Sequence, residues 1–507
     1  MHGSYNNLVE FSADFSASRE KLENIIANLI SPAFAQREHG DIEEFIQQEG
    51  TELLRTLLQS YLDVRTKNEV HHSAILSSGQ TLNHVRQNTS RKMISLFGSV
   101  NVNRLGYSQR HKDSRFPLDK ELNLPRDHYS DGLRRRLIHE AIKSSFDESV
   151  KSIDRYTGGH IPKRQTMFLV NDIAQNFEAF YARKRFLEPE KTEDLLVLSF
   201  DGKGIVMRHD SLRSATKKAA NAQEHKLQTR LSQGEKRNRK RMAQVATVYT
   251  VKHHIRPAES IIKRTQDNVT YLRPKIRNKR VWASVERDSE TVIIEAFQEA
   301  LQRDPMQSRQ WVILVDGHPH QIKLIKRVMR QLKIKAPIIQ DFIHVLEYVW
   351  KAAWCFFEKG TDAAEAWVEE RALKILNGQA GLVAAGIKRS ATKRKMTEKE
   401  RGAIDDCASY LIKGKTRLQY DVALKAGYPI ATGVIEGACR HLINDRLDIT
   451  GARWCLQGAE AILKLRSIYS SGDFDVYWMF HKQKSAERMY GDLVPTIYNE
   501  PNRFFAK

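Results

Sequence analysis

The sequence is poor in cysteine: its 507 residues include only four, at positions far apart in the chain. No CxxC pair is present, so neither a zinc ribbon nor a disulfide scaffold is indicated. The sequence also lacks an N-terminal signal pattern and an apolar run of about 18 residues, the usual mark of a membrane span. P-loop and HExxH motifs are absent, which leaves an ATPase or a zinc protease without support. These absences predict a soluble protein of a reducing compartment, with no membrane partner.

The formal net charge of +21 is the strongest feature of the composition. It indicates a polyanionic partner, because basic patches accumulate phosphates by releasing counterions. Ribosome-associated and membrane-surface proteins are basic too, so charge alone does not identify the partner. The length predicts roughly three domains, and the 41% hydrophobic content is enough for their cores.

Residues 1–93 are predicted to be a helical region, because apolar residues recur every three or four positions from about residue 19 to 65. Such helices either pack as plain core helices or pair with a second copy of the chain. Residues 94–128 are predicted to be a β-hairpin, alternating and β-branched around Gly98, followed by a loop.

Residues 129–190 are predicted to be a helix-turn-helix region. Ser130 can cap a first helix, a second helical pattern breaks at Gly158-Gly159, and a third begins at about Pro162. In a helix-turn-helix, the N-terminal residues of the second helix enter the major groove of DNA. An ordinary helical hairpin has the same pattern. The residues that would contact phosphates or base edges are Lys163, Arg164, Gln165 and Thr166.

From residue 191 the periodicity changes to strands, and residues 191–341 are predicted to be the first part of an α/β core. One buried-type run ends at Asp201 and another, WVILVD, ends at Asp316. Strands that alternate with helices indicate a mixed sheet, in which polar residues at the ends of neighbouring strands converge on one edge. Residues 428–472 would be the last part of this core, with Glu436 near the start of a helical segment.

Three carboxylates in this arrangement indicate magnesium chemistry. Magnesium prefers hard oxygen ligands, and two such ions can activate the attacking oxygen and stabilise the leaving oxygen of a phosphodiester displacement. Two aspartates at strand ends plus a helical glutamate are how a ribonuclease H-like fold holds two ions. Each residue also has a structural explanation, since Asp201 can belong to a turn, Asp316 can cap a helix and Glu436 can be a solvated helix residue.

Positive side chains surround the predicted core. The basic loop at residues 212–242 ends in GEKRNRKRM, and a charge run of this kind is usually a solvated loop. Beside a metal site, it is well placed to hold the DNA backbone. The predicted backbone contacts are Lys236, Arg237, Arg239, Lys240, Arg241, Arg446 and Arg453.

Arg440 is predicted to be accessory to the active site, because it lies on the same helical face as Glu436. Arg440 follows Glu436 by four positions, and Asp341 and His344 are three positions apart, so each pair shares a helical face. Residues 342–427 are predicted to be a helical insertion into the core, and residues 473–507 a C-terminal tail without assigned chemistry.

Eight runs resemble bacterial insertion-sequence transposases of the Kra group, the ISKra family: FPLD, NKRVWASVE, RDP, VDGHPHQI, DFIHVLEYVWKAAW, PIATGVIEGACRHL, DITGARW and GAEAILKLRS. These enzymes are similar to the wider DDE class, which has a ribonuclease H-like core. The resemblance implies that Asp201, Asp316 and Glu436 are the catalytic triad and the ligands of two Mg²⁺ ions, for which Mn²⁺ can substitute. Asp341 and His344 match the D-x-x-H signature of the related Mutator-like transposases, and the resemblance implies that they are accessory active-site residues. Some relatives carry paired cysteines after the hairpin, but YSQRHKDSRFPLD has none, so we expect no structural zinc.

By this resemblance, we expect a transposase that binds the terminal repeats of its insertion sequence and catalyses magnesium-dependent DNA strand cleavage and strand transfer. Its partners would be double-stranded DNA, at the element ends and at the target, and a second copy or larger assembly of the chain. It would be cytoplasmic and associated with the bacterial nucleoid through DNA. The alternatives are a simple metal-dependent nuclease and a transposase-derived DNA-binding regulator without catalysis.

Overall fold

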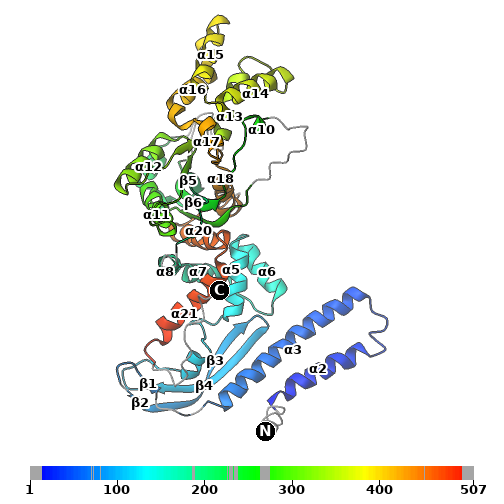
Figure 1. The fold of residues 1–507 in the computed structure, drawn as a ribbon. Coiled ribbons are helices and arrows are strands. Elements are labelled where there is room, and N and C mark those ends of the chain that lie inside the picture. Colours follow the sequence, from blue (N-terminus) through cyan, green and yellow to red (C-terminus); the bar gives the residue numbers. More distant parts are fainter. Residues whose placement is uncertain are drawn as a thin grey trace. The chain divides into compact units, whose positions relative to one another are not determined.

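The computed structural model describes residues 14–69, 71, 74–79, 81–184, 189–224, 227, 232, 238–262, 274–449 and 451–493. These residues form two compact units (Figure 1). The first unit contains the chain up to Asn176 and again from Phe474, and the second contains Phe177–Asp473. Among the described residues, no helix combines the length and the apolar character needed to cross a membrane.

The first unit combines helices with a long β-hairpin. Its elements are α2 (Ser16–Leu29), α3 (His39–Lys67), β1 (Ala74–Ile75), β2 (Thr81–Leu82), β3 (His84–Ser95), β4 (Gly98–Ser108), α4 (Pro117–Glu121), α5 (Asp131–Ala141), α6 (Phe146–Tyr156), α7 (Lys163–Ala174) and α21 (Phe474–Tyr490).

The predicted β-hairpin is present and is longer than expected. Strands β3 and β4 pair antiparallel from His84↔Ser108 to Ser95↔Gly98, so the hairpin begins ten residues before the predicted start at residue 94. The additional part of β3 is mostly polar and lacks the apolar alternation that marks a half-buried strand. Helix α3 lies along β4, where the Gln59 amide donates to the main-chain oxygen of Asn101.

The three predicted helices after the hairpin are present as α5, α6 and α7. Ser130 caps α5 by accepting the Leu133 N–H. The turn between α6 and α7 needs glycine, because a Cβ at Gly158 would lie 2.4 Å from the main-chain oxygen of Phe97. The Gly158 N–H donates to the Leu96 oxygen, so the turn is fixed against the tip of the hairpin.

The second unit is a five-stranded mixed sheet with helices, which confirms the predicted mixed α/β fold. Its elements are α8 (Phe177–Lys184), β5 (Leu195–Val206), η1 (His209–Ser211), α9 (Ser214–Asn221), β6 (Lys240–Val251), α10 (Glu259–Ile262), β7 (Arg277–Ser284), α11 (Ser289–Arg303), β8 (Trp311–Val315), α12 (Pro319–Gln331), β9 (Ile338–Gln340), α13 (Phe342–Ala353), α14 (Asp362–Leu376), α15 (Ala380–Lys393), α16 (Glu398–Gly414), η2 (Lys415–Arg417), α17 (Tyr420–Lys425), α18 (Gly433–Cys439), η3 (Arg440–Asn444), α19 (Asp445–Leu447) and α20 (Leu456–Ser470).

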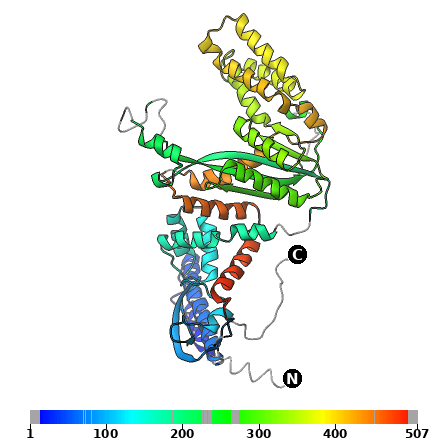
Figure 2. The ribbon, with the colours of Figure 1, turned by 90° about the vertical axis from the view of Figure 1, so that its left-hand side faces the viewer.

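The strand order in this sheet is β7-β6-β5-β8-β9. Strands β5, β6 and β7 are antiparallel neighbours, whereas β8 runs parallel to β5 and β9 runs parallel to β8. One face packs on the helices α13–α17, where Val197 and Leu314 share a buried core with Val345 and Leu411. Helix α11 lies on the opposite face (Figure 2). The ring of Phe297 in α11 stacks on that of Phe200 in β5.

Helix α20 has a different place from the one predicted. The core stripe of the run GAEAILKLRSIY predicts a final helix that covers the remaining face of the sheet, but the polar side chains of α20 lie along the free edge of β7. The Val281 N–H donates to the hydroxyl of Ser471, the residue after the helix, and the Ala283 N–H donates to the hydroxyl of Ser467. The carboxylate of Glu460 accepts the Val285 N–H at 2.9 Å. These bonds satisfy an edge that would otherwise be open to pairing with another strand.

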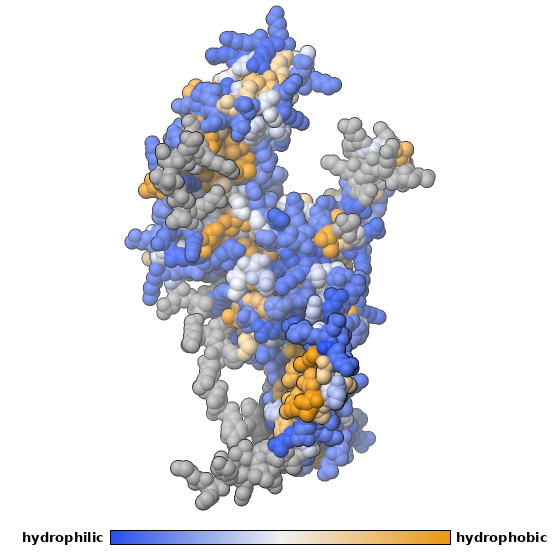
Figure 3. Space-filling view, turned by 90° about the vertical axis from the view of Figure 1, so that its right-hand side faces the viewer, coloured by the Kyte–Doolittle hydropathy of each residue, from blue (hydrophilic) through white to orange (hydrophobic). Residues whose placement is uncertain are grey.

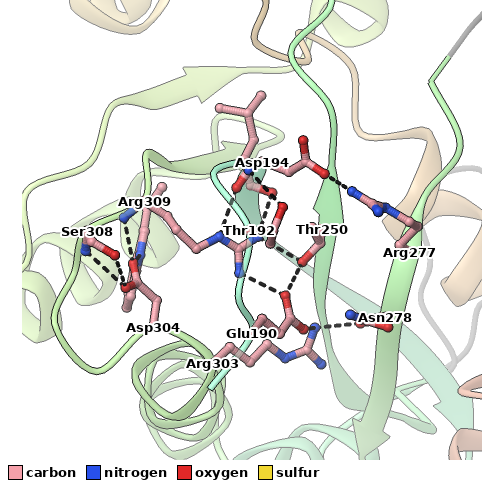
Figure 4. Close-up of polar contacts among 12 residues, drawn as sticks. Glu190, Thr192, Asp194, Thr250, Arg277, Asn278, Arg303, Asp304, Ser308 and Arg309 are labelled. Carbon is pink, nitrogen blue, oxygen red and sulfur yellow. Dashed lines mark hydrogen bonds and ion pairs between the residues drawn. The ribbon is translucent and has the colours of Figure 1, made fainter. Parts of the chain in front are cut away.

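A buried ion-pair network fixes the end of the sheet where β5 and β8 begin (Figure 4). The Arg309 side chain is 2% exposed and pairs with the Glu190 carboxylate at 2.8 Å. It also donates to the main-chain oxygen of Asp194 and to the Thr250 hydroxyl, so one guanidinium joins β6 to the segments that enter β5 and β8. The polar side chains described next lie beyond the other end of β8 and at the same level within β5.

Candidate active site

Three aspartates lie in one row across three parallel strands: Asp316 and Asp341 directly follow β8 and β9, whereas Asp201 lies within β5. The prediction that the first strand ends at Asp201 is wrong, because β5 continues to Val206 and stays paired with β6. The register pairs Ser199 of β5 with Leu314 of β8, and Val315 of β8 with Gln340 of β9. Continued past the last pairs, it places Asp201 level with Asp316 and Asp316 level with Asp341. Neighbouring strands are about 4.8 Å apart, and level residues of parallel strands point to the same face. The sheet therefore brings together three carboxylates that span 140 positions of sequence.

The turn after Asp316 needs glycine at position 317. Gly317 has a φ of +103°, and a Cβ there would lie 2.9 Å from the Gln340 amide nitrogen and 3.0 Å from the Tyr410 hydroxyl. The Asp316 carboxylate accepts the His318 N–H at 2.9 Å, as a cap of α12 would. Tyr410, from α16 of the helical insertion, donates its hydroxyl to the Asp316 main-chain oxygen at 2.7 Å. The carboxylate is thereby set at the edge of the sheet.

Asp341 is fully buried and is the N-cap of α13. Its carboxylate accepts the N–H groups of Ile343, His344 and Thr432, and the His344 imidazole lies 2.9 Å from Oδ2 through Nδ1. Burial acts to raise the pKa of Asp341, but these hydrogen bonds outweigh it and lower the pKa. The hydrogen bond to Asp341 raises the pKa of His344 to about 9. The pair is thus an ionised carboxylate beside an imidazolium.

Glu436 lies in the first turn of α18 and joins this pair. Its Oε1 accepts the Thr432 hydroxyl at 3.1 Å, and the Thr432 N–H donates to Asp341, so Thr432 connects the two carboxylates. Ligand atoms of Asp341, His344 and Glu436 all lie within 4.8 Å of one another, which is the spacing that a shared metal ion requires. Asp341 and His344, predicted as accessory, therefore lie beside Glu436, whereas Asp201 and Asp316, its predicted partners in holding the metal, are not in this group of ligand atoms.

Asp201 is joined to the same helix through Cys439. The Cys439 thiol lies 3.1 Å from Oδ2 of Asp201 and donates to it, while Oδ1 accepts the Gly202 N–H. Burial and the negative charge of Asp201 raise the pKa of the Cys439 thiol, which keeps the proton on sulfur. Cys439 follows Glu436 by three positions, so one turn of α18 contacts both Asp201 and the Asp341 pair.

The donors of this site fit a hard divalent cation. Asp201, Asp316, Asp341 and Glu436 supply carboxylate oxygens, the ligands that Mg²⁺ and Mn²⁺ prefer. Nδ1 of His344 is bonded to Asp341, so the other ring nitrogen, Nε2, is the one that a metal could use after losing its proton. The π-helical turn η3 directly after α18 is a feature often found at functional sites.

The predicted contacts of the first unit are partly on the surface. Lys163, Arg164 and Gln165 are exposed at the start of α7. Lys163 pairs with Asp147 in the first turn of α6. Thr166 is a correction: it is fully buried and its hydroxyl donates to the Pro162 oxygen, so it cannot contact DNA. Thr166 lies on the inward-facing side of α7, and a run of polar residues in the sequence does not show which of them face inward.

The predicted contacts of the second unit divide in the same way. Lys236 and Arg237 lie outside the described residues, Arg239 is half-buried, and Lys240 and Arg453 are exposed. Arg241 has a structural role, because its guanidinium donates to the main-chain oxygens of Ser211, Val285 and Glu286.

Two predictions near Glu436 differ from the structure. Arg446 is 2% exposed and lies over the Trp454 ring, so it is a core residue and the prediction of a phosphate contact is wrong. Burial lowers the pKa of Arg446 to about 10. Arg440 is 75% exposed and lies 3.9 Å from Asp445, so its nearest charged partner belongs to α19 and not to the carboxylate row.

Sequence reasoning missed Thr432, Cys439 and Tyr410. A signal was present for the first two, since Thr432 precedes Glu436 by four positions and Cys439 follows it by three, which places them on its face of the helix. Tyr410 gave no signal, because only the tertiary packing of α16 brings it to Asp316.

A scan of protein-family models found no match to this sequence, and a search among curated proteins found none either.

Proposed function

We propose that the protein is a DDE transposase with a ribonuclease H-like core. It binds the terminal repeats of its insertion sequence and catalyses metal-dependent DNA strand cleavage and strand transfer. The observation that carries the proposal is the row of Asp201, Asp316 and Asp341 with Glu436 packed against it. The mixed sheet with β5, β8 and β9 parallel supports the ribonuclease H-like assignment.

Asp201, Asp316 and Glu436 would hold two Mg²⁺ ions, for which Mn²⁺ could substitute. Asp341 and His344 would lie beside these ligands. When bound, the metal supplies charge stabilisation for the attacking and leaving oxygens. Water attacks a phosphorus at the element end, and the bond to the 3′ oxygen breaks to give a 3′-hydroxyl and a 5′-phosphate. That hydroxyl then loses its proton, attacks a target phosphorus and displaces the 3′ oxygen of the target strand.

The protein would position this DNA through exposed groups of both units. In α7, the second helix of the proposed helix-turn-helix, Lys163, Arg164 and Gln165 would contact the terminal repeat. In the second unit, a Cβ at Gly433 or Gly437 would meet nothing within 4 Å, so the backbone of α18 beside Glu436 is open to a DNA strand.

The proposal is tested by a cleavage and joining assay. The full chain is incubated with DNA that carries the element ends, with Mg²⁺ or with EDTA, beside Asp316→Ala. Nicking at the ends and joined products, both lost with EDTA and in the variant, are expected. Cutting without joining would identify a nuclease, binding without cutting would identify a regulator, and cutting that survives Asp316→Ala would contradict the proposed site.

A further inference from the structure

The hairpin of α2 and α3 exposes an apolar face. On α2 the exposed side chains are Leu22 and Ile26, and the C-cap residue Ile30 is 80% exposed. On α3 they are Ile46, Leu54, Leu57 and Tyr61, between 37% and 47% exposed. Figure 3 shows a continuous hydrophobic patch, surrounded by hydrophilic residues, on the side of the molecule that carries this hairpin.

The spacing of these residues makes one stripe along each helix. Successive residues advance by about 100° around a helix, so positions 22, 26 and 30 fall within about 80° of one another, as do 46, 54, 57 and 61. Gly50 lies within the α3 stripe, and a Cβ there would meet nothing within 4 Å. The stripe thus includes a shallow point that could receive a side chain.

Both stripes lie on the same side of the hairpin. The two helices run antiparallel and contact each other through Ser18 and Ser60, whose hydroxyls are 3.3 Å apart. Viewed along each helix from its N-terminus, the stripe is rotated about the helix axis by roughly 100° from the contact serine. The direction of this rotation is the same in α2 and in α3. Because the helices run in opposite directions, equal rotations turn both stripes to one side.

The stripe on α3 is separate from the surface that α3 uses inside the unit. Gln59 and Thr66 donate to the main-chain oxygens of Asn101 and Asn103, so this side of the helix rests on β4. These positions are about 180° from Ile46 and Leu57 around the helix.

The charge of the hairpin argues against DNA as the occupant. Residues 14–67 contain ten acidic and six basic side chains, a net charge of −4 in a chain whose total is +21. A polyanion would be repelled by this segment and attracted to the rest of the chain. An apolar face with acidic surroundings fits a protein partner.

We propose that this face binds the same face of a second copy, so that two hairpins form a four-helix bundle. The area is sufficient. Helices of 14 and 29 residues are about 21 and 43 Å long and about 10 Å wide, which gives a projected area of about 600 Å². Interdigitating side chains add to that value, and a stable interface buries about 800 Å² on each partner. The resemblance already implies an assembly of copies; the new inference is the surface through which two copies join, and its argument does not use the catalytic site.

The test is the mass of the full chain in solution without DNA, by sedimentation equilibrium. The wild type is expected at twice the 58.5 kDa of the chain. A double variant, Ile26→Glu with Leu57→Glu, places a charge in each stripe and is expected to weaken the dimer by about a hundredfold or more. Asn24→Glu with Gln48→Glu is the matched control, because both residues are exposed and lie away from the stripes.

A monomeric wild type at tens of micromolar would overturn the proposal, as would a dimer that survives the double variant. Circular dichroism of the variants verifies that the helices are folded. Dimerisation that appears only after removal of residues 1–13 would also overturn it, because the chain itself would then cover the face. Since no catalysis is measured, failure here and failure of the transposase assay are distinguishable.

Discussion

The hydroxyl of Tyr410 donates a hydrogen bond to the main-chain oxygen of Asp316 at 2.7 Å, across 94 positions of sequence. Tyr410 belongs to the helical insertion, and Asp316 ends a central strand of the sheet. The Tyr410 ring stacks on Tyr348 of α13, with centroids 4.1 Å apart. Burial raises the pKa of Tyr410, so the hydroxyl keeps its proton and remains a donor. The insertion therefore helps to set the position of the Asp316 carboxylate.

We expect Tyr410→Phe to lower kcat for strand cleavage by about fivefold, because losing one such hydrogen bond costs about 1 kcal/mol and frees the Asp316 turn. The KM for DNA should stay unchanged, since Tyr410 acts by positioning Asp316. Tyr348→Phe keeps the stacked ring and is the control. Equal kcat values for wild type and Tyr410→Phe would show that this contact is only structural.

Removing Arg309 should destabilise the second unit strongly. Arg309→Met leaves the Glu190 carboxylate partly buried without its main partner, and breaking a buried pair in this way costs about 3–5 kcal/mol. Urea denaturation gives the free energy of unfolding of this unit. Arg389→Met changes an exposed arginine of α15 and should cost less than about 0.5 kcal/mol. A loss that small in Arg309→Met would be evidence against the network in Figure 4.

His481 should make the first unit sensitive to acid. It is fully buried, with Nδ1 2.9 Å from the Asn176 amide nitrogen, and burial holds its pKa well below the usual value. Asp172 opposes this effect and Arg134 and Arg488 reinforce it.

The unfolded state, with an ordinary histidine pKa of about 6.5, binds the proton first as the pH falls. Stability is therefore complete above about pH 6.5 and decreases below it, by up to about 1.4 kcal/mol per pH unit. Thermal unfolding between pH 7 and 4.5 measures the slope. His481→Gln should reduce it, and an unchanged slope would assign the acid sensitivity to other groups.

The start of α7 should contribute to DNA affinity through Lys163. Lys163→Ala is expected to weaken binding to the terminal repeat and to lower the slope of log K against log salt by about one, the effect of one lost phosphate contact. Thr166→Ala, at the buried position of the same helix, should lower stability and leave the affinity of the folded protein unchanged. Unchanged DNA affinity in Lys163→Ala together with weakened affinity in Thr166→Ala would rule out α7 as the DNA-contacting helix.

The sequence predicted local features well, but it did not predict how segments distant in sequence align and pack against one another. The end of β8, the helices α5 to α7 and the cap at Ser130 follow from periodicity and capping chemistry, which are local. The continuation of β5 past Asp201 to Val206 was missed, because the polar residues Asp201–Lys203 read as a turn and only their pairing with β6 keeps them in the strand. The level placement of Asp341 with Asp316 was not predictable, because it depends on the register of β9 against β8. Likewise, only packing shows that Thr166 and Arg446 face inward and that α20 lies on the edge of the sheet.

The most direct test of the metal site is a titration of the full chain with Mn²⁺, followed by electron paramagnetic resonance of the free ion. The wild type should bind Mn²⁺, and Asp316→Ala should bind it at least tenfold more weakly because the row loses one carboxylate. Asp406→Ala, which removes an exposed aspartate of α16, should behave as the wild type. Equal Mn²⁺ affinity in the wild type and Asp316→Ala would contradict the assignment of this row as the catalytic metal site.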